Sequence, residues 1–181
     1  MFELSHQVLF WVQALGFVSM AIGWWANAQS CDSKLVSGNL LASSLTAIHL
    51  GLLGSTLGMM NQLLNIGRFA SCRSEKARSG WRITLLPLLF STLAVLQGLI
   101  WAEHWSEWCA VAAAVLMSYA LFYCSALKLR YAMLLSNLLN LMLSVHLLSW
   151  SGIIYQLVTV AIIVKGLPAI KQQSYELERA T

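Results

Sequence analysis

Long hydrophobic runs, separated by short polar segments, divide this chain into seven predicted helices. The runs cover residues 8–28, 35–54, 57–72, 83–102, 108–125, 131–149 and 152–170. A helix needs about 20 apolar residues to cross the hydrocarbon core of a bilayer, and most of the runs approach that length. The run at 57–72 is the shortest, and an amphipathic helix lying on the membrane surface would give a similar pattern. The pattern predicts an all-α membrane protein with seven transmembrane helices.

Composition supports a protein that lies almost wholly within the membrane. The chain has 181 residues, of which 59% are hydrophobic and only 10% are charged, and its mean hydropathy is +0.70. Seven spans use about 140 residues and leave roughly 40 for loops and tails. We therefore expect residues 1–181 to form a single integral membrane domain. The remaining length leaves no room for a separate soluble catalytic domain. We also expect no enzymatic activity, because the sequence has no phosphate-binding loop, no set of residues for a catalytic nucleophile and no pair of carboxylates within a span.

The basic residues fall on one side of a seven-span arrangement. They are Lys34; Arg68, Arg73, Lys76, Arg78 and Arg82; Lys128 and Arg130; and Lys165, Lys171 and Arg179. The other side has no Lys or Arg, but it holds Glu103, Glu107 and all four histidines. Positive residues collect in cytoplasmic loops, so the N-terminus is predicted outside and the C-terminus in the cytoplasm. The same pattern explains the net charge of +4 without nucleic-acid binding.

The first hydrophobic run is predicted to remain as a membrane helix. Ala26-Asn27-Ala28 resembles a signal-peptidase site, but Glu3 stands where a signal peptide carries positive charge. The four cysteines show no metal-ligand spacing, and three of them lie at predicted cytoplasmic ends, where thiols stay reduced. The histidines match no zinc motif either. We expect no metal, no cofactor and no disulfide framework.

The second half of the chain is predicted to repeat the first. A shift of 94 residues aligns residues 34–72 with residues 128–166 and gives ten identities in 39 positions. Gly58 and Gln62 then match Gly152 and Gln156. The predicted units are repeat one at 8–72, a linker helix at 83–102, repeat two at 108–170 and a cytoplasmic tail at 171–181. An odd linker gives both three-helix repeats the same orientation, which is the 3+1+3 parallel arrangement of SWEET-type transporters.

Two segments resemble the YgjV-like family of small bacterial inner-membrane proteins. They are His49 with Gly54 and then Leu64-Asn65-Ile66-Gly67-Arg68, and Ala120-Leu121-Phe122-Tyr123-Cys124 running on to Arg130. The resemblance covers roughly residues 8–172. It implies a bacterial inner-membrane location and a layout similar to the SWEET and PQ-loop superfamily, with a small-solute pathway between two helix triads. The chain lacks the Pro-Gln dipeptide of that superfamily.

Uncharged polar residues inside the predicted spans, together with one arginine, are the candidates for a solute pathway. They are Asn61, Gln62, Asn65, Arg68, Asn39, Asn137, Asn140 and Gln156. An unpaired polar group in hydrocarbon costs several kcal/mol, so these side chains must face other helices or a wet cavity. The alternative is that they only hold helices together. For Asn61, Asn65 and Arg68, which share one helix stripe, a functional role is favoured.

Arg68 and Asn65 are predicted to bind an anionic or carbonyl-bearing group near the cytoplasmic mouth. The alternative is an arginine that extends to the interface and only sets topology. Two functions stay open: a carrier for a small polar solute that works by rocking of the two triads, and a non-transporting scaffold or subunit of a larger complex. The partners are the lipid bilayer and, for a carrier, the solute; an oligomer also remains open.

Overall fold

Seven helices make up the described part of the chain in this computed structural model. The structure describes residues 6–54, 56–73, 81–102, 104–146 and 148–180, without the side chains of 6, 56, 57, 82, 151 and 173–180. The helices are α1 (His6–Asn27), α2 (Asp32–Leu52), α3 (Thr56–Arg73), α4 (Arg82–Trp101), α5 (Glu107–Tyr123), α6 (Ala126–His146) and α7 (Trp150–Ala180). Each predicted hydrophobic run therefore corresponds to one helix, and the prediction of an all-helical chain is confirmed.

Four of these helices are long and apolar enough to cross a membrane. The segments are Gln7–Asn27, Asp32–Leu52, Ile83–Trp101 and Gly152–Gln172, and Glu107–Tyr123 is a shorter apolar helix. The remaining two helices, α3 and α6, carry most of the candidate polar residues, which lowers their apolar content. The chain is therefore a membrane protein with several apolar helices.

Three helix boundaries differ from the sequence prediction. Helix α7 runs on through Pro168 to Ala180, so the predicted tail begins as a continuation of the helix. Lys128 and Arg130, predicted to lie in a basic loop, belong to the first turns of α6. Helix α3 begins at Thr56, one residue before the predicted run at 57–72, so the turn after α2 is short. Gly54 takes a positive φ of 78° at this turn, a conformation that glycine adopts without steric cost.

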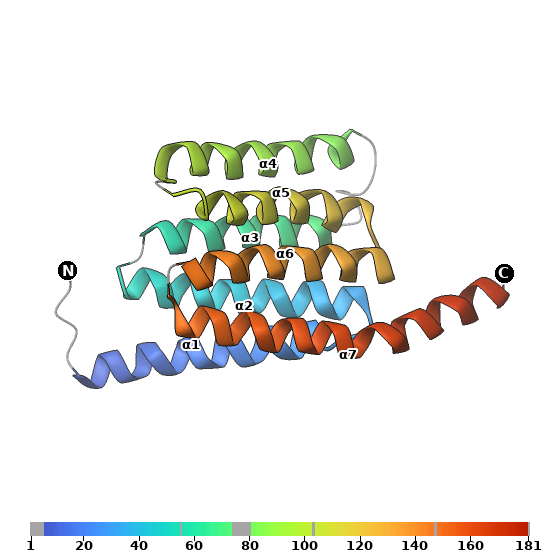
Figure 1. The fold of residues 1–181 in the computed structure, drawn as a ribbon, viewed down its shortest axis with the longest axis horizontal. Helices are drawn as coiled ribbons and strands as arrows, with labels where there is room; N and C mark the ends of the chain where they lie inside the picture. The colour runs from blue at the N-terminus through green and yellow to red at the C-terminus, as the bar shows by residue number, and fades with distance from the viewer. Residues whose placement is uncertain (1–5, 55, 74–80, 103, 147, 181) are drawn as a thin grey trace.

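The helices lie side by side with their axes along one direction and alternate in sense (Figure 1). The C-terminal ends of α1, α3 and α5 and the N-terminal ends of α2, α4 and α6 therefore lie at one end of the bundle, where α7 also finishes. We call this the basic end, since Lys34, Arg73 and Lys128 lie there. The opposite ends of these helices lie at the other end of the bundle, which we call the acidic end because α5 begins there with Glu107.

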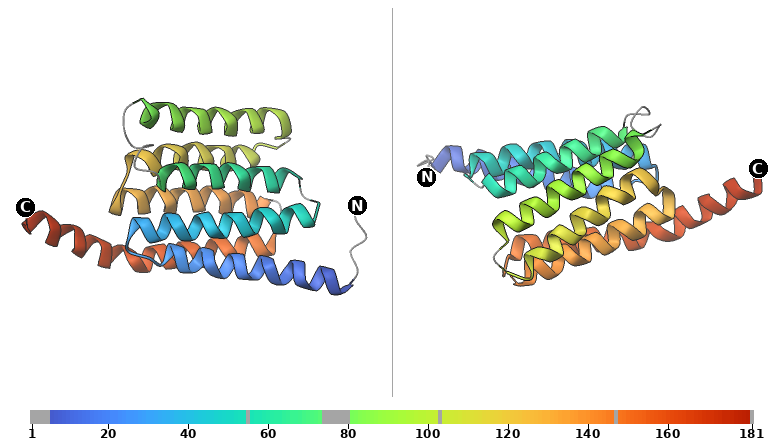
Figure 2. Two further views of the ribbon diagram at one scale, coloured as in Figure 1. Left: turned by 180° about the vertical axis from the view of Figure 1, so that it is seen from behind. Right: turned by 90° about the horizontal axis from the view of Figure 1, so that it is seen from above.

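The bundle is built in two layers. In one layer, α2 packs between α1 and α3; in the other, α5 packs against α4 and α6, and α6 packs against α7. The layers meet where α1 contacts α7 and where α3 contacts α4 and α5 (Figure 2). Between them lies a buried apolar cluster that includes Leu35 of α2, Leu121 of α5, Leu129 of α6 and Ile163 of α7.

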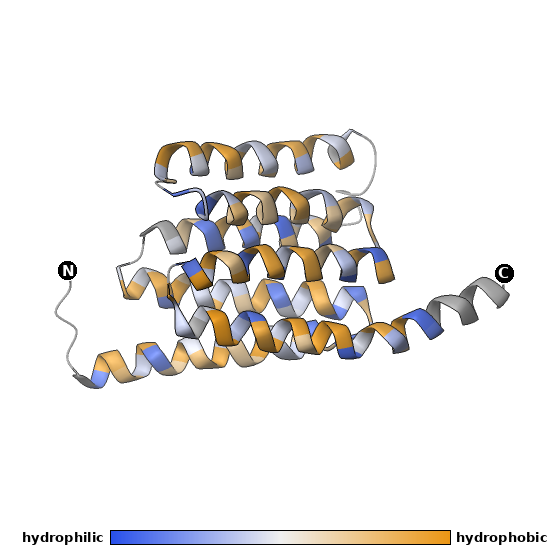
Figure 3. Ribbon diagram, in the orientation of Figure 1, coloured by the Kyte–Doolittle hydropathy of each residue, from blue (hydrophilic) through white to orange (hydrophobic). Residues whose placement is uncertain are grey.

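The outside of the bundle is apolar. Large side chains such as Phe10, Phe17, Leu99 and Ile100 expose between 64% and 70% of their surface. Hydrophobic residues dominate the helices in Figure 3, and hydrophilic residues occur mostly as single positions along them. A soluble protein rarely exposes so much contiguous apolar surface, whereas lipid chains accommodate it.

Polar contacts join α1 to α2 along their length. Ser19 of α1 donates from Oγ to the carbonyl of Ala42 at 2.7 Å and also contacts the hydroxyl of Thr46. Asn39 of α2 donates from Nδ2 to Oδ1 of Asn27 at 3.3 Å. These contacts satisfy polar groups that would otherwise be unpaired in an apolar environment. They hold the first helix pair together.

Candidate functional site

The polar stripe of α3 faces α5, across the junction of the two layers. Arg68 donates from Nη1 to the carbonyl of Ala114 at 2.7 Å, and Cys72 donates from Sγ to the carbonyl of Leu121 at 2.9 Å. Both acceptors belong to α5. The predicted stripe is therefore an inter-layer contact, and it lies where the chain's first three helices meet its last four.

Arg68 is buried, and its exposed fraction is only 2%. Its Nη2 donates to Oδ1 of Asn65 at 2.6 Å, and its Nη1 approaches Oγ of Ser118 at 3.4 Å. Asn65 in turn donates to Oε1 of Gln62 at 3.2 Å. The alternative in which Arg68 extends to the membrane interface is therefore wrong, because its guanidinium is enclosed by α3 and α5.

A cavity of about 350 Å³ lies beside this stripe, between α3, α4, α5 and the last turns of α6. It is lined by Gly58, Asn61, Ala94, Gln97, Gly98, Trp101, Ala102, Glu107, Ala110, Val111, Ala114 and Leu143. Most of these positions belong to the ends of helices that meet at the acidic end of the bundle. Ala94 and Ala114 lie deeper, and the carbonyl of Ala114 is the one that accepts from Arg68. The cavity therefore reaches from the acidic end to the neighbourhood of Arg68.

Small residues create the space and the close contacts around it. A Cβ placed on Gly98 of α4 would come within 2.6 Å of Cγ2 of Val111, so α4 and α5 approach closely there. Glu107 stands at the start of α5 and accepts from the backbone N–H of His104 at 3.0 Å. The described residues contain no group of three or more His, Cys, Asp or Glu side chains able to hold a metal ion.

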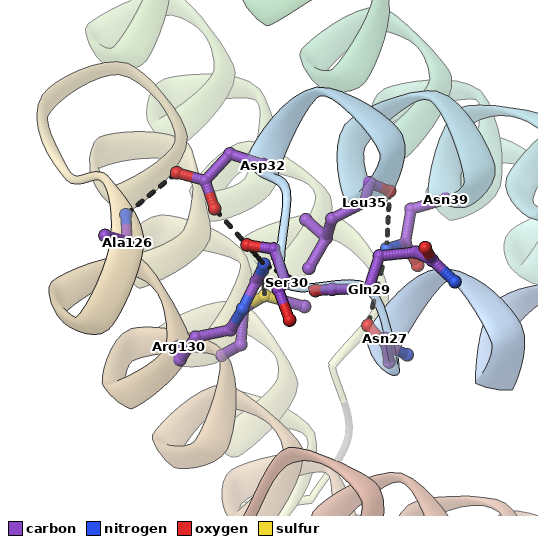
Figure 4. Close-up of polar contacts among 9 residues, drawn as sticks. Asn27, Gln29, Ser30, Asp32, Leu35, Asn39, Ala126 and Arg130 are labelled. Carbon is purple, nitrogen blue, oxygen red and sulfur yellow. Dashed lines mark hydrogen bonds and ion pairs between the residues drawn. The ribbon is translucent and has the colours of Figure 1, made fainter. Parts of the chain in front are cut away.

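A buried ion pair joins the two layers at the basic end (Figure 4). Arg130 of α6 has an exposed fraction of 1%, and its Nη2 lies 3.2 Å from Oδ1 of Asp32. The same nitrogen donates to the carbonyls of Gln29 at 2.8 Å and Ser30 at 3.2 Å. Asp32 also accepts at Oδ2 from the backbone N–H of Ala126 at 2.8 Å. We call this set of contacts the Asp32–Arg130 latch.

The backbone conformation of Ala126 is held by the latch. Ala126 has a φ of 48°, in the left-handed region, which costs an L-residue about 1 kcal/mol. Its backbone N–H is held by the Asp32 carboxylate in that conformation. Because Asp32 accepts from the backbone of Ala126 and forms an ion pair with Arg130, the latch holds the α1–α2 connection against the first turns of α6.

The structure does not bring the other predicted pathway residues into the cavity. Asn137 and Asn140 of α6 donate to the carbonyls of Met133 and Ser136 in their own helix, at 2.7 and 3.0 Å. Asn39 lies in the α1–α2 contact described above. Gln156 of α7 has a buried Oε1 with no hydrogen-bond partner among the described residues. Within the predicted set, Asn61 alone lines the cavity, while Gln62, Asn65 and Arg68 extend from it along α3.

Sequence reasoning missed the functional candidates Asp32 and Gln97, and it placed Arg130 in a loop. Gln97 lies near the C-terminal end of the strongly apolar helix α4, which is a signal the sequence does contain. The contact of Asp32 with the start of α6, which also brings it to Arg130, has a subtler signal in the sequence. Asp32 and Ala126 are separated by 94 residues, which is the shift of the repeat predicted from the sequence.

Comparison with protein families identifies this chain. A family model described as "Imp-YgjV: Bacterial inner membrane protein" matches residues 10–173, which is most of the sequence. Comparisons with curated proteins and with solved structures gave no match. The chain therefore belongs to this YgjV family of bacterial inner-membrane proteins, and its apolar helices place it in that membrane.

Proposed function

For this bacterial inner-membrane protein of the YgjV family, we propose that it is a non-enzymatic carrier for a small polar solute, working by alternating access. One observation carries the proposal. The cavity and the Asp32–Arg130 latch lie at opposite ends of the junction between the two layers. A cavity at one end, with an ion pair across the other, is the arrangement that a carrier has in one of its two access states.

We propose further that all seven helices cross the bilayer as two parallel three-helix repeats, with α4 as the linker. The order of packing supports this, since α2 lies between α1 and α3 while α6 lies between α5 and α7. Helices α1 and α5 run in the same direction, as do α2 and α6 (Figure 1). A two-fold axis parallel to the helices would bring equivalent positions together at the junction. Asp32 and Ala126, equivalent under the 94-residue shift, are bonded there.

The proposed orientation has the basic end in the cytoplasm and the acidic end outside. This follows the usual collection of Lys and Arg in cytoplasmic loops. The cavity then opens outward and the latch closes the cytoplasmic side. We propose that this arrangement corresponds to an outward-open state, in which the solute would pass Asn61 and then the Asn65–Arg68 pair.

A scaffold without transport is the second candidate, and specific contacts favour it too. Asn39, Asn137 and Asn140 all make hydrogen bonds that hold a helix or a helix pair. A scaffold needs polar residues only at dry contacts, whereas a carrier needs water in the cavity. Hydration of Asn61 therefore separates the two functions.

The proposed function predicts that Asn61→Cys reacts with a membrane-impermeant maleimide added outside the cell. The variant is made in a background with the four native cysteines replaced by serine. Maleimide needs a water-exposed thiolate, so Asn61→Cys should label several-fold faster than Met60→Cys. Met60 is the neighbouring position, with 42% of its surface on the apolar exterior. Equal and negligible labelling at both positions would favour the scaffold.

Cys31 supplies the internal control for sidedness. It is exposed at the N-terminus of α2, at the basic end. The backbone N–H groups of Lys34 and Ser33 hold the pKa of its thiol below the usual value, which favours the reactive thiolate. A variant that keeps Cys31 alone should label only when the reagent reaches the cytoplasmic side. Labelling of Cys31 from outside would reverse the proposed orientation.

A further inference from the structure

The buried guanidinium of Arg68 has only uncharged partners. It donates to the carbonyls of Leu64 and Ala114, and to Asn65 and Ser118. All of these acceptors are neutral, so none of the described partners of Arg68 balances its charge. A buried cation without a counter-ion is strongly unfavourable. Arg130 is equally buried but has a carboxylate partner. Arg68 therefore differs from it in having no anionic partner among the described residues.

The cavity reaches a residue that is in contact with this cation. Ala114 is shared, because it lines the cavity and its carbonyl accepts from Nη1 of Arg68 at 2.7 Å. Asn61, which also lines the cavity, lies seven residues before Arg68 on the same face of α3, about two turns away. Arg68 itself does not line the cavity, and a ligand that fills it would end at Ala114, the residue whose carbonyl accepts from the guanidinium. A carboxylate there would supply the missing negative charge and would match the planar, forked donors of arginine.

The cavity walls restrict the rest of the ligand. Apolar residues such as Val111, Trp101 and Leu143 form most of the lining, and the polar side chains are those of Asn61, Gln97 and Glu107. Glu107 lies seven residues before Ala114 on α5, which is about 10 Å along the helix. Its negative charge would repel a second anionic group at the mouth. The site thus suits one carboxylate on an apolar body.

We propose that the cavity binds a monocarboxylate with an apolar body, its carboxylate directed toward Arg68 and its apolar part held beside Trp101 and Val111. This inference rests on the proposed function, because it names the chemical class of the solute. It requires a modest shift of the Arg68 side chain, so that the guanidinium exchanges a neutral acceptor for the carboxylate. Arg68 is a binding residue here, and Asn65 is the residue that orients it.

The test is binding to the purified full-length protein in detergent, measured by isothermal titration at pH 7. Benzoate and its neutral analogue benzamide form one probe pair, and hexanoate and the dicarboxylate adipate form the other. We expect benzoate to bind at least tenfold more tightly than benzamide, and hexanoate more tightly than adipate. Benzamide binding as tightly as benzoate would overturn the proposal, as would no binding of either monocarboxylate.

Variants assign the binding to this site. Arg68→Lys keeps the charge but loses the fork, and we expect a weakening of at least tenfold for benzoate. Because a change at a buried arginine can impair folding, Ala110→Phe is the second variant, since it fills the cavity without altering Arg68. It should abolish benzoate binding. Lys128→Gln removes an exposed cation at the basic end and should bind like the wild type. Unchanged binding in Arg68→Lys or Ala110→Phe would contradict the assignment.

The two proposals fail in different ways. Benzoate that binds through Arg68, in a protein that gives no benzoate counterflow in proteoliposomes, would support the monocarboxylate site and reject the carrier. Outward labelling of Asn61→Cys without any monocarboxylate binding would support the hydrated cavity of a carrier and reject the monocarboxylate. The binding and transport measurements therefore decide the two claims separately.

Discussion

Replacing Arg130 with leucine is expected to lower the free energy of unfolding by about 3 kcal/mol. The substitution leaves the Asp32 carboxylate without its ion-pair partner and removes the donor to the Gln29 and Ser30 carbonyls. Breaking a buried ion pair costs about 3–5 kcal/mol. The lower end of that range applies, because the Asp32 side chain keeps 26% of its surface exposed.

The measurement is reversible unfolding of the purified protein in mixed micelles, followed by tryptophan fluorescence. Lys128→Leu is the matched control, because it removes the same charge two residues away from an exposed position. It should change the free energy of unfolding by less than about 0.5 kcal/mol. Adding Asp32→Asn to Arg130→Leu should recover part of the loss. Equal stability of Arg130→Leu and Lys128→Leu would show that the latch contributes nothing.

Gly38→Leu is expected to separate α1 from α2 and to lower the free energy of unfolding by about 2 kcal/mol or more. A Cβ on Gly38 would lie 2.6 Å from Cβ of Ala26 and 3.3 Å from its Cα, so backbone as well as side chain must move. Overpacking a well-packed contact costs about 1–3 kcal/mol, and leucine adds far more than a single methyl group. The hydrogen bond between Asn39 and Asn27, next to this contact, would also be stretched.

Gly166→Ala of α7 is the matched control for this prediction. A Cβ at Gly166 meets no atom within 4 Å. Alanine is a better helix former than glycine by about 1 kcal/mol, so this variant should be as stable as the wild type or more stable. If the Gly38→Leu protein unfolds at the same denaturant concentration as the Gly166→Ala protein, the close packing of α1 against α2 at Gly38 would be contradicted.

The hydrophobic pattern was sufficient to predict the helices, because each hydrophobic run is bounded by short polar segments, even where the helix itself carries several polar residues, as α3 and α6 do. It also predicted that Asn65 and Arg68 share a face, since residues three apart on a helix are neighbours. The structure shows them hydrogen-bonded, with Arg68 reaching α5. Local periodicity is therefore a sound guide to which face of α3 is buried.

Partners distant in the sequence were not predictable in this way. Arg130 looks like a basic loop residue, and only the fold brings it to carbonyls that lie 100 and 101 residues earlier. Asn137 and Asn140 have the polarity of pathway residues, but an asparagine can also donate to the carbonyl four residues back in its own helix. The cavity depends on the spacing of α3, α4 and α5, which Gly98 and the alanines of α5 allow.

The most direct test of alternating access is labelling of Ala114→Cys from each side of the membrane. Ala114 lies at the deep end of the cavity, next to Arg68. With the latch intact, an impermeant maleimide should react from outside only. With Asp32→Asn, which removes the ion pair across the basic end, reaction from the cytoplasmic side should rise several-fold while reaction from outside falls. Labelling that is absent from both sides, or that ignores Asp32→Asn, would contradict alternating access through this cavity.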